Sequence, residues 1–250
     1  MDKKEIMELA CRAGKVVLEN GGEIYRVEQT MTSICAAYGI YDCESFATPT
    51  IIILSAPSTH EESYSRMMRI TVRGINLNKV AEINRFSRKL PIAINEALAE
   101  LERIEKITSY PLWVSILASS IGVGAFTIIF GGGFSDIAGG LILGALIRLT
   151  ITGLQRKRAG DFVVNLIGGA VAALGGWLIS QIGNPWIVTV SAMMLLVPGL
   201  LFTNALRDIA AGDFVSGGSR GIEVFSIATA LACGAAAVYA VVALIGGGLP

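Results

Sequence analysis

The feature that most constrains this chain is a sharp change in polarity after residue 112. Residues 1–112 hold 14 of the 20 Lys and Arg residues and 15 of the 20 Asp and Glu residues. The other 138 of the 250 residues therefore hold only 6 basic and 5 acidic side chains. From this change we predict two domains, a polar one over residues 1–112 and a very apolar one over residues 113–250.

The apolar domain contains five runs long enough to cross the hydrocarbon core of a bilayer, which needs about 20 apolar residues in a helix. These runs are residues 113–130, 134–152, 162–180, 186–206 and 222–246. Tryptophans fall near the ends of three runs, as interfacial aromatic residues do. The sequence therefore predicts an all-α polytopic bundle of five transmembrane helices, with the lipid bilayer as its surroundings.

The orientation of these helices follows from the basic residues between them. Three lie in the turn over residues 153–161 and two in the turn over residues 207–221, whereas the other two turns have none. Basic turns face the cytoplasm. With five spans the polar domain is then cytoplasmic too, and the charged start of the chain, without an apolar core, is not typical of a signal peptide. We expect a multi-pass protein of the cell (inner) membrane.

The polar domain has helical spacing in its first 38 residues, with a stop at Gly21 and Gly22. Short β-branched runs follow and indicate strands. The predicted order after the first two helices is strands over residues 43–48, 50–56 and 67–72, and helices over residues 79–90 and 92–107. Pro91 would occupy the first position of the last helix, where proline is well tolerated. This order predicts a small cytoplasmic α+β domain.

Composition argues against several classes of function. The net charge is zero and no basic run appears, so we expect no nucleic-acid partner. The four cysteines form no CxxC pair and the chain has a single histidine, His60, so we expect no metal and no cofactor. No nucleophile stands beside a base in the pattern that covalent catalysis requires, so we expect no catalytic residues and no enzyme.

The fourth predicted span carries Pro198 and Gly199 near its middle. Proline lacks an amide hydrogen, so a helix breaks or kinks there. Irregular backbone at membrane depth survives only where it is buried in protein or lines a wet cavity. The break is therefore either a tolerated kink or part of a substrate path. Thr203 and Asn204, which follow it, can hydrogen-bond either a small polar solute or a neighbouring helix.

Charged residues are rare in the apolar domain, so each is a candidate. Arg148, near the cytoplasmic end of the second span, either extends to the membrane surface or binds a substrate carboxylate with its planar guanidinium. Asp136 and Asp161 each begin a span. They are the candidates for proton coupling, although capping a helix N-terminus is the alternative for both.

The most distinctive polar string runs from Gly21 to Glu28. Glu23 and Arg26 are three residues apart on a helix start and can pair, while Glu28 faces elsewhere. Their functional interpretation is contact with the membrane domain, and the alternative is a solvated first turn. On the other side of such a contact, Arg220 lies in a long polar turn. We take Glu23, Arg26, Glu28 and Arg220 as candidates for coupling the two domains.

These strings together resemble the threonine/serine exporter family, in its short form with a soluble N-terminal domain and five spans. The resemblance extends over nearly the whole chain. The strings that carry it are Ala13-Gly14, residues 21–28, 46–50, 73–77 and 197–199, Asn204 and Arg220.

The resemblance implies a subunit of a proton-gradient-driven antiporter that exports threonine- or serine-type amino acids through the inner membrane. Long members of the family contain a second membrane half. The resemblance therefore implies a separate small membrane protein that supplies that half, in an oligomer. Related two-component systems imply a dicarboxylate of the succinate type as an alternative substrate. A membrane-anchored hydrolase and a regulatory subunit are the remaining alternatives.

Overall fold

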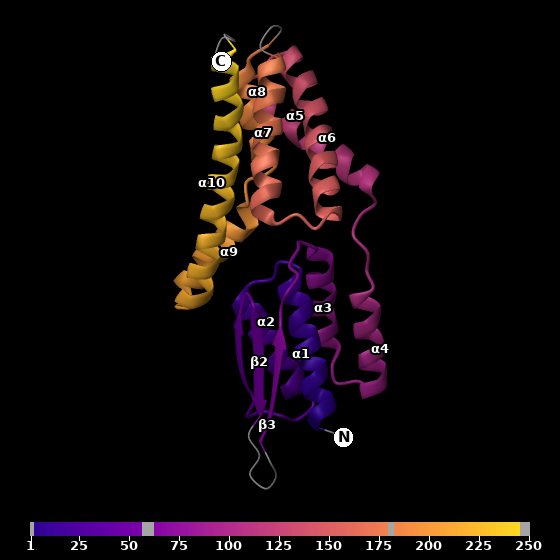
Figure 1. Ribbon diagram of the computed structural model, residues 1–250. Coiled ribbons are helices and arrows are strands. Elements are labelled where there is room, and N and C mark those ends of the chain that lie inside the picture. The colour runs from indigo at the N-terminus through magenta and orange to yellow at the C-terminus, as the bar shows by residue number, and fades with distance from the viewer. Residues whose placement is uncertain (1–2, 57–62, 180–182, 246–250) are drawn as a thin grey trace. The chain divides into compact units, whose positions relative to one another are not determined.

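The computed structural model describes residues 3–56, 63–179 and 183–245. The chain is mostly helical, with a small sheet near its N-terminus and a group of long apolar helices (Figure 1). It divides into two compact units. The first contains Met1–Ser109 together with Leu200–Gly221, and the second contains Tyr110–Gly199 and Ile222–Pro250. His60, the single histidine of the chain, lies outside the described residues.

The first unit has the predicted order of two helices, three strands and two helices. Its elements before residue 110 are α1 (Lys3–Glu19), α2 (Ile24–Ala37), β1 (Glu44–Thr48), β2 (Ile51–Ala56), β3 (Tyr64–Arg69), α3 (Leu77–Lys89) and α4 (Ile94–Glu105). The strands form one antiparallel sheet in the order β1-β2-β3.

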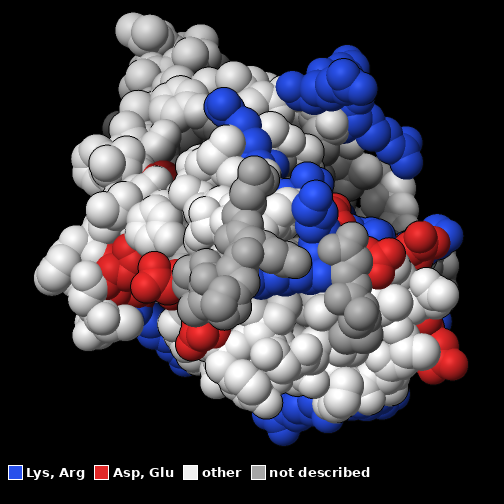
Figure 2. Space-filling model, turned by 90° about the horizontal axis from the view of Figure 1, so that it is seen from below, with Lys and Arg blue, Asp and Glu red and all other residues white. Residues whose placement is uncertain are grey.

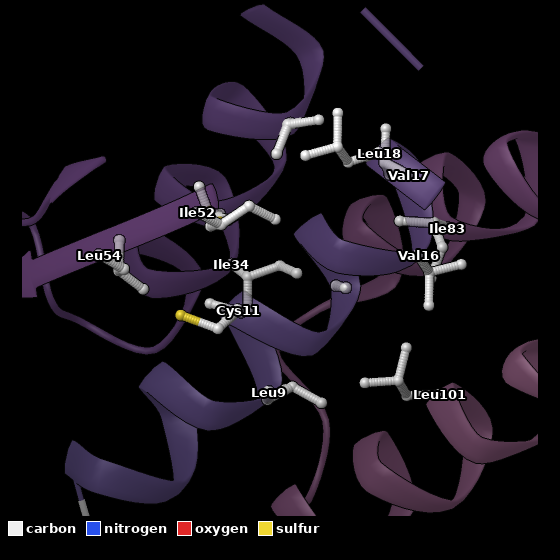
Figure 3. Close-up of a cluster of buried hydrophobic side chains, with 14 of the residues drawn as sticks. Leu9, Cys11, Val16, Val17, Leu18, Ile34, Ile52, Leu54, Ile83 and Leu101 are labelled. Atoms are coloured by element: carbon white, nitrogen blue, oxygen red, sulfur yellow. The ribbon is translucent and has the colours of Figure 1, made fainter. Parts of the chain in front are cut away.

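Helix α1 lies at the centre of this unit, where it contacts α2, α3, α4, β2 and β3 (Figure 1). Side chains from α1, α2, β2, α3 and α4 meet in a single buried cluster, which includes Leu9, Ile34, Leu54, Ile83 and Leu101 (Figure 3). The period of two in a strand puts alternate residues of β2 on one face, and these are the buried ones. Burial of this apolar surface is the main force that holds the unit together.

Two predicted boundaries in this unit are wrong. Strand β3 covers Tyr64–Arg69 rather than residues 67–72, because Arg69 already pairs with Ile51, the first residue of β2. Helix α4 begins at Ile94, so Pro91 does not occupy its first position. The carbonyl of Ile92 instead accepts a hydrogen bond from Tyr38 Oη at 2.9 Å, a tertiary contact that the sequence did not indicate.

The later helices are apolar. They are α5 (Leu112–Ile129), α6 (Phe134–Arg156), α7 (Asp161–Ile179), α8 (Pro185–Met194), α9 (Gly199–Ala210) and α10 (Phe214–Leu244). Among the described residues, α5, α6, α7 and α10 are each long and apolar enough to cross a membrane. The pair α8 and α9 passes the same test only when taken together, and it is bent by 55°. The ends of the predicted third and fifth spans, Ser180 and Gly246, lie outside the described residues.

The predicted turn over residues 207–221 is almost entirely helical. Helix α9 continues to Ala210 and α10 already begins at Phe214. The short link contains Gly212 with a φ of +90°, a backbone conformation that suits glycine. Asp213 then caps α10, because its Oδ1 accepts a hydrogen bond from the Ser216 amide at 3.1 Å.

Glycines allow close contact between helices of the second unit. A Cβ atom on Gly144 of α6 would lie 2.5 Å from the carbonyl oxygen of Ser119 on α5. A Cβ atom on Gly234 of α10 would lie 1.9 Å from the carbonyl oxygen of Leu166 on α7. Small residues that let backbones approach are typical of helix packing in membranes.

Candidate functional site

The turn between α1 and α2 places Glu23 in the interior of the first unit. Gly21 has a φ of +92°, and a Cβ atom on Gly22 would lie 2.3 Å from Val17 Cγ1, so both positions require glycine. Glu23 follows as the N-cap of α2 and is only 6% exposed. Its Oε2 pairs with Arg26 Nε and its Oε1 with Arg207 Nη1.

Two effects compete over the pKa of Glu23. Burial raises this pKa, because a carboxylate loses its water. Hydrogen bonds from Tyr25 and Arg207, together with the charge of Arg26, outweigh burial and lower the pKa below its ordinary value. Glu23 is therefore an ionised, buried acid that is neutralised by two arginines.

A second ion pair lies against the same turn. Arg220 Nη1 and Asp208 Oδ2 are 3.2 Å apart, and the two side chains are only 5% and 2% exposed. Arg220 Nη2 also donates to the carbonyl of Gly22 at 3.0 Å, and the amide of Ile24 donates to Asp208. Buried charges persist only when they are paired and hydrogen-bonded. The pair thus fastens α9 and the start of α10 to the beginning of α2.

Strand β1 is hydrogen-bonded to α2 and to the start of α10. The Ala47 amide donates to Glu28 Oε1 at 2.9 Å, and the Ala47 carbonyl accepts from Ser216 Oγ at 3.4 Å. Asn204, which is buried, donates from Nδ2 to the Gly21 carbonyl at 3.2 Å. We use the name charge cluster for these six charged residues of the first unit: Glu23, Arg26, Glu28, Arg207, Asp208 and Arg220.

Burial also acts on Glu28. It raises the pKa of this carboxyl group, and the nearby carboxylates Asp213 and Asp208 raise it further. The hydrogen bond from the Ala47 amide lowers the pKa but does not cancel these effects. The charge cluster therefore holds one acid with a lowered pKa and one with a raised pKa.

The structure brings together all four residues that the sequence suggested for domain coupling, and the predicted pairing of Glu23 with Arg26 is present. Arg207 and Asp208 were recognised only as part of a polar turn. Their signal was present in the sequence, because charged residues are so rare after residue 112. The sequence did not indicate their partners, because residues such as Glu23 and Arg207 are 184 positions apart.

The break between α8 and α9 lies where proline indicated it. Helix α8 ends at Met194, and Pro198 directly precedes α9. Pro198 cannot donate the hydrogen bond that the carbonyl of Met194 would receive in a continuous helix. Thr203 is exposed and donates to the carbonyl of Leu200 at 3.0 Å, while a Cβ atom on Gly199 would have no neighbour within 4 Å.

Asp136 accepts hydrogen bonds from the N-cap residues of two helices. It is 5% exposed, its Oδ2 accepts from the Gly133 amide at 2.9 Å, and its Oδ1 accepts from the Asn184 amide at 2.6 Å. Gly133 and Asn184 are the N-caps of α6 and α8. This is the capping geometry that the sequence offered beside a proton-coupling role. Asp161 is exposed at the first residue of α7.

Arg148 lies half-buried on α6. Its Nε is buried and has no hydrogen-bond partner within the described residues. A buried guanidinium nitrogen without a partner carries a desolvation cost that a bound carboxylate would offset. The two interpretations that the sequence offered for Arg148, extension to the membrane surface and binding of a substrate carboxylate, both stay predictions.

The described residues contain no group of three or more His, Cys, Asp or Glu side chains that could hold a metal ion. Figure 2 shows Lys and Arg side chains and Asp and Glu side chains both spread over the face seen from below, with uncharged surface between them.

Comparisons with known proteins match this chain to exporters and transporter subunits. Residues 8–242 match the family model described as "Putative threonine/serine exporter". The chain is 25% identical to the "Threonine/serine exporter" of Corynebacterium glutamicum and 22% identical to the "Probable threonine/serine exporter" of Mycobacterium tuberculosis, in each case over 87% of this chain. These matches cover 47% and 42% of the two relatives, so the chain spans less than half of their length.

A shorter relative matches along most of its length. The chain is 24% identical to the "Probable succinate transporter subunit YjjP" of Klebsiella aerogenes, over 88% of this chain and 87% of that protein. No solved structure matches the chain.

Proposed function

Because this chain belongs to the threonine/serine exporter family, we propose that it is a membrane-spanning subunit of an exporter of small polar metabolites that carry a carboxylate. The observation that carries the proposal is the extent of the family match. Among the described residues, the matched range 8–242 includes the charge cluster and, except for the last two residues of α10, all the helices that could cross a membrane.

Contacts within the first unit support five crossings. Residues 200–221 pack in the same unit as residues 1–109, so the chain must lie on one side of the membrane both before α5 and at the start of α10. Helices α5, α6 and α7 supply three crossings, an odd number. In this proposal the segment over residues 185–199, which contains α8 and the break, returns the chain, and α10 makes the fifth crossing.

The number of crossings also supports a cytoplasmic location for the first unit. After α5 and α6 the chain is back on the side of the first unit. Arg156 at the end of α6 lies there, with Lys157 and Arg158 in the turn before α7. Because short basic turns face the cytoplasm, this side is the cytoplasm of a cell whose inner membrane holds the protein.

The break between α8 and α9 is the proposed substrate path. Helix α8 has 10 residues and is thus about 15 Å long. That is about half of the roughly 30 Å hydrocarbon core. Broken helices with freed backbone carbonyls are a recurring way to build transport sites. We assign Arg148 as the residue that binds the substrate carboxylate, since its Nε lacks a partner within the described residues.

Threonine and serine are the substrates named for the long relatives, and succinate for the short one. Both kinds of substrate present a carboxylate to Arg148. We propose amino-acid export driven by the proton gradient, with dicarboxylate export as the second candidate. The word "subunit" in the short relative's name favours a second membrane protein as partner.

The test is transport in proteoliposomes that contain the chain and its co-purified partner, with labelled threonine, serine or succinate. We expect flux only under a proton gradient. Arg148→Gln should raise the apparent KM by about tenfold or more, because a charge-assisted hydrogen bond is lost. Arg156→Gln, on the same helix at its basic end, should leave KM unchanged. Absence of flux for all three substrates, or equal KM values for the two variants, would contradict the proposal.

A further inference from the structure

A cavity of about 210 Å³ lies between α2 and α3 in the first unit, beside the charge cluster. Arg26 and Gln29 of α2 line one side, and Asn84 and Arg88 of α3 line the other. The proposed transport path does not use this cavity. Its volume is below the roughly 300–1,000 Å³ of pockets that hold drug-sized ligands, so it suits a small metabolite.

The charged side chains that line this cavity are all basic. Arg26 and Arg88 both line it, and none of its described lining residues is acidic. Arg88 is exposed and makes no hydrogen bond or ion pair within the part of the chain that the structure describes. The hydrogen bonds that Arg26 makes within that part all use Nε, toward Glu23 and Tyr25. The terminal nitrogens of two guanidinium groups are thus left for a ligand.

The polar groups around these arginines also suit an anion. The side-chain amides of Gln29 and Asn84 and the hydroxyl of Thr30 are hydrogen-bond donors in the same cavity. Val17 and Val80 supply apolar surface for a short carbon chain. A planar guanidinium matches a carboxylate with two parallel hydrogen bonds. Two such groups without an acid between them favour a dianion over a zwitterion, whose ammonium group would have no partner.

We infer that this cavity binds a small organic dicarboxylate. Arg26 connects the site to the charge cluster, because the same side chain pairs with Glu23, and Glu23 also pairs with Arg207 of α9. A carboxylate on the terminal nitrogens of Arg26 shares this guanidinium with Glu23. Binding therefore alters the charge balance at the pair of Glu23 with Arg207 of α9.

The experiment uses the full-length purified chain in detergent. Calorimetric titrations with succinate, threonine and inorganic phosphate measure affinity, and hydrogen–deuterium exchange locates the binding. Succinate should bind most tightly of the three and should protect the amides of Ile24–Ala37 and Leu77–Lys89. Arg88→Gln should weaken succinate binding by about tenfold or more and remove that protection. Arg85→Gln, on the same helix and outside the cavity lining, should bind succinate as the unchanged protein does.

Several results would overturn the inference. They are equal succinate affinities for the Arg88→Gln and Arg85→Gln variants, succinate binding without protection of α2 and α3, tighter binding of threonine or phosphate than of succinate, or no binding at all. Unchanged exchange in α1 and β2 would show that Arg88→Gln is folded. This result is independent of transport: flux with no Arg88-dependent binding refutes the site alone, and binding without flux refutes the proposed function alone.

Discussion

The two carboxylate oxygens of Glu23 bind two arginines that are far apart in the chain. Oε2 pairs with the neighbouring Arg26 of α2, and Oε1 pairs with Arg207 of α9. Helix α9 follows the break at Pro198 and leads into α10. Residues 200–221 are thereby held against residues 1–109 within the first unit. In the proposed exporter, this ion pair offers a physical route by which the first unit can influence α9 and the break before it.

Glu23→Gln should loosen this attachment. Its two partners are 50% and 63% exposed, so water screens part of the interaction. We therefore expect a loss of about 1–2 kcal/mol in the free energy of unfolding, seen as a lower thermal midpoint. Glu100→Gln removes an acid of the same type from its i,i+3 arginine on the surface, and its midpoint should hardly change. Equal shifts for the two variants would argue against a special role for Glu23.

The pH dependence of stability should reveal Glu28. Burial raises its folded pKa above the unfolded value of about 4.3, so the folded state holds its proton more tightly. Below a pH of about 4.3, the Glu28 carboxyl group is protonated in both the folded and the unfolded state, and it does not lower the free energy of unfolding. As pH rises from there through the folded pKa, ionisation in the folded state costs stability. Glu28→Gln keeps an acceptor for Ala47 and avoids this cost.

The thermal midpoint of Glu28→Gln should therefore exceed that of the unchanged protein at pH 7. The difference should shrink to nothing as the pH is lowered to about 4. A difference that stays constant over this range would show that Glu28 does not titrate in this way.

Asp208 and Arg220 should behave as a coupled pair. Asp208→Asn leaves a buried guanidinium without its counter-charge, and we expect a loss of about 3 kcal/mol. Arg220→Gln should cost a similar amount, and the double variant should lose clearly less than the sum of the two. Unfolding of all three variants in detergent gives the coupling free energy. Additive losses would mean that the ion pair contributes nothing of its own.

Close packing of α5 and α6 predicts different effects for two glycines of one helix. Gly144→Ala puts a methyl group against the Ser119 carbonyl and should lower the thermal midpoint of the bundle. Gly153→Ala, also on α6, has nothing within 4 Å of the new carbon and should be tolerated or slightly stabilising. The opposite ranking in a thermal-shift assay would show that the two helices can separate without cost.

Pro198→Ala should restore the missing backbone donor and favour a continuous helix, since proline in a helix interior costs about 3 kcal/mol relative to alanine. We expect flux to fall while membrane insertion is unchanged. Pro185→Ala is the control, because Pro185 occupies the first position of α8, where proline fits a helix. If Pro198→Ala transports at the normal rate, the proline is only a tolerated kink.

Local chemistry allowed several features to be predicted from the sequence alone. The scarcity of charge after residue 112 indicated the apolar helices, since few residues there could face water along a whole helix. The order of helices and strands in the first unit followed from hydrophobic spacing, and the break followed from the covalent structure of Pro198. Each of these depends on residues close together in the chain, where spacing alone determines what is possible.

Tertiary structure alone decided which distant segments meet. The sequence predicted a span end and a polar turn over residues 200–221, yet these residues pack with residues 1–109. Arg207 pairs with Glu23 at the N-cap of α2, and Asp208 pairs with Arg220. The end of β3 was likewise decided by where β2 begins. No spacing rule connects residues 184 positions apart, because such contacts depend on how whole elements bury their surfaces. The sequence thus supplied the charged groups, and only the fold determined which of them neutralise each other.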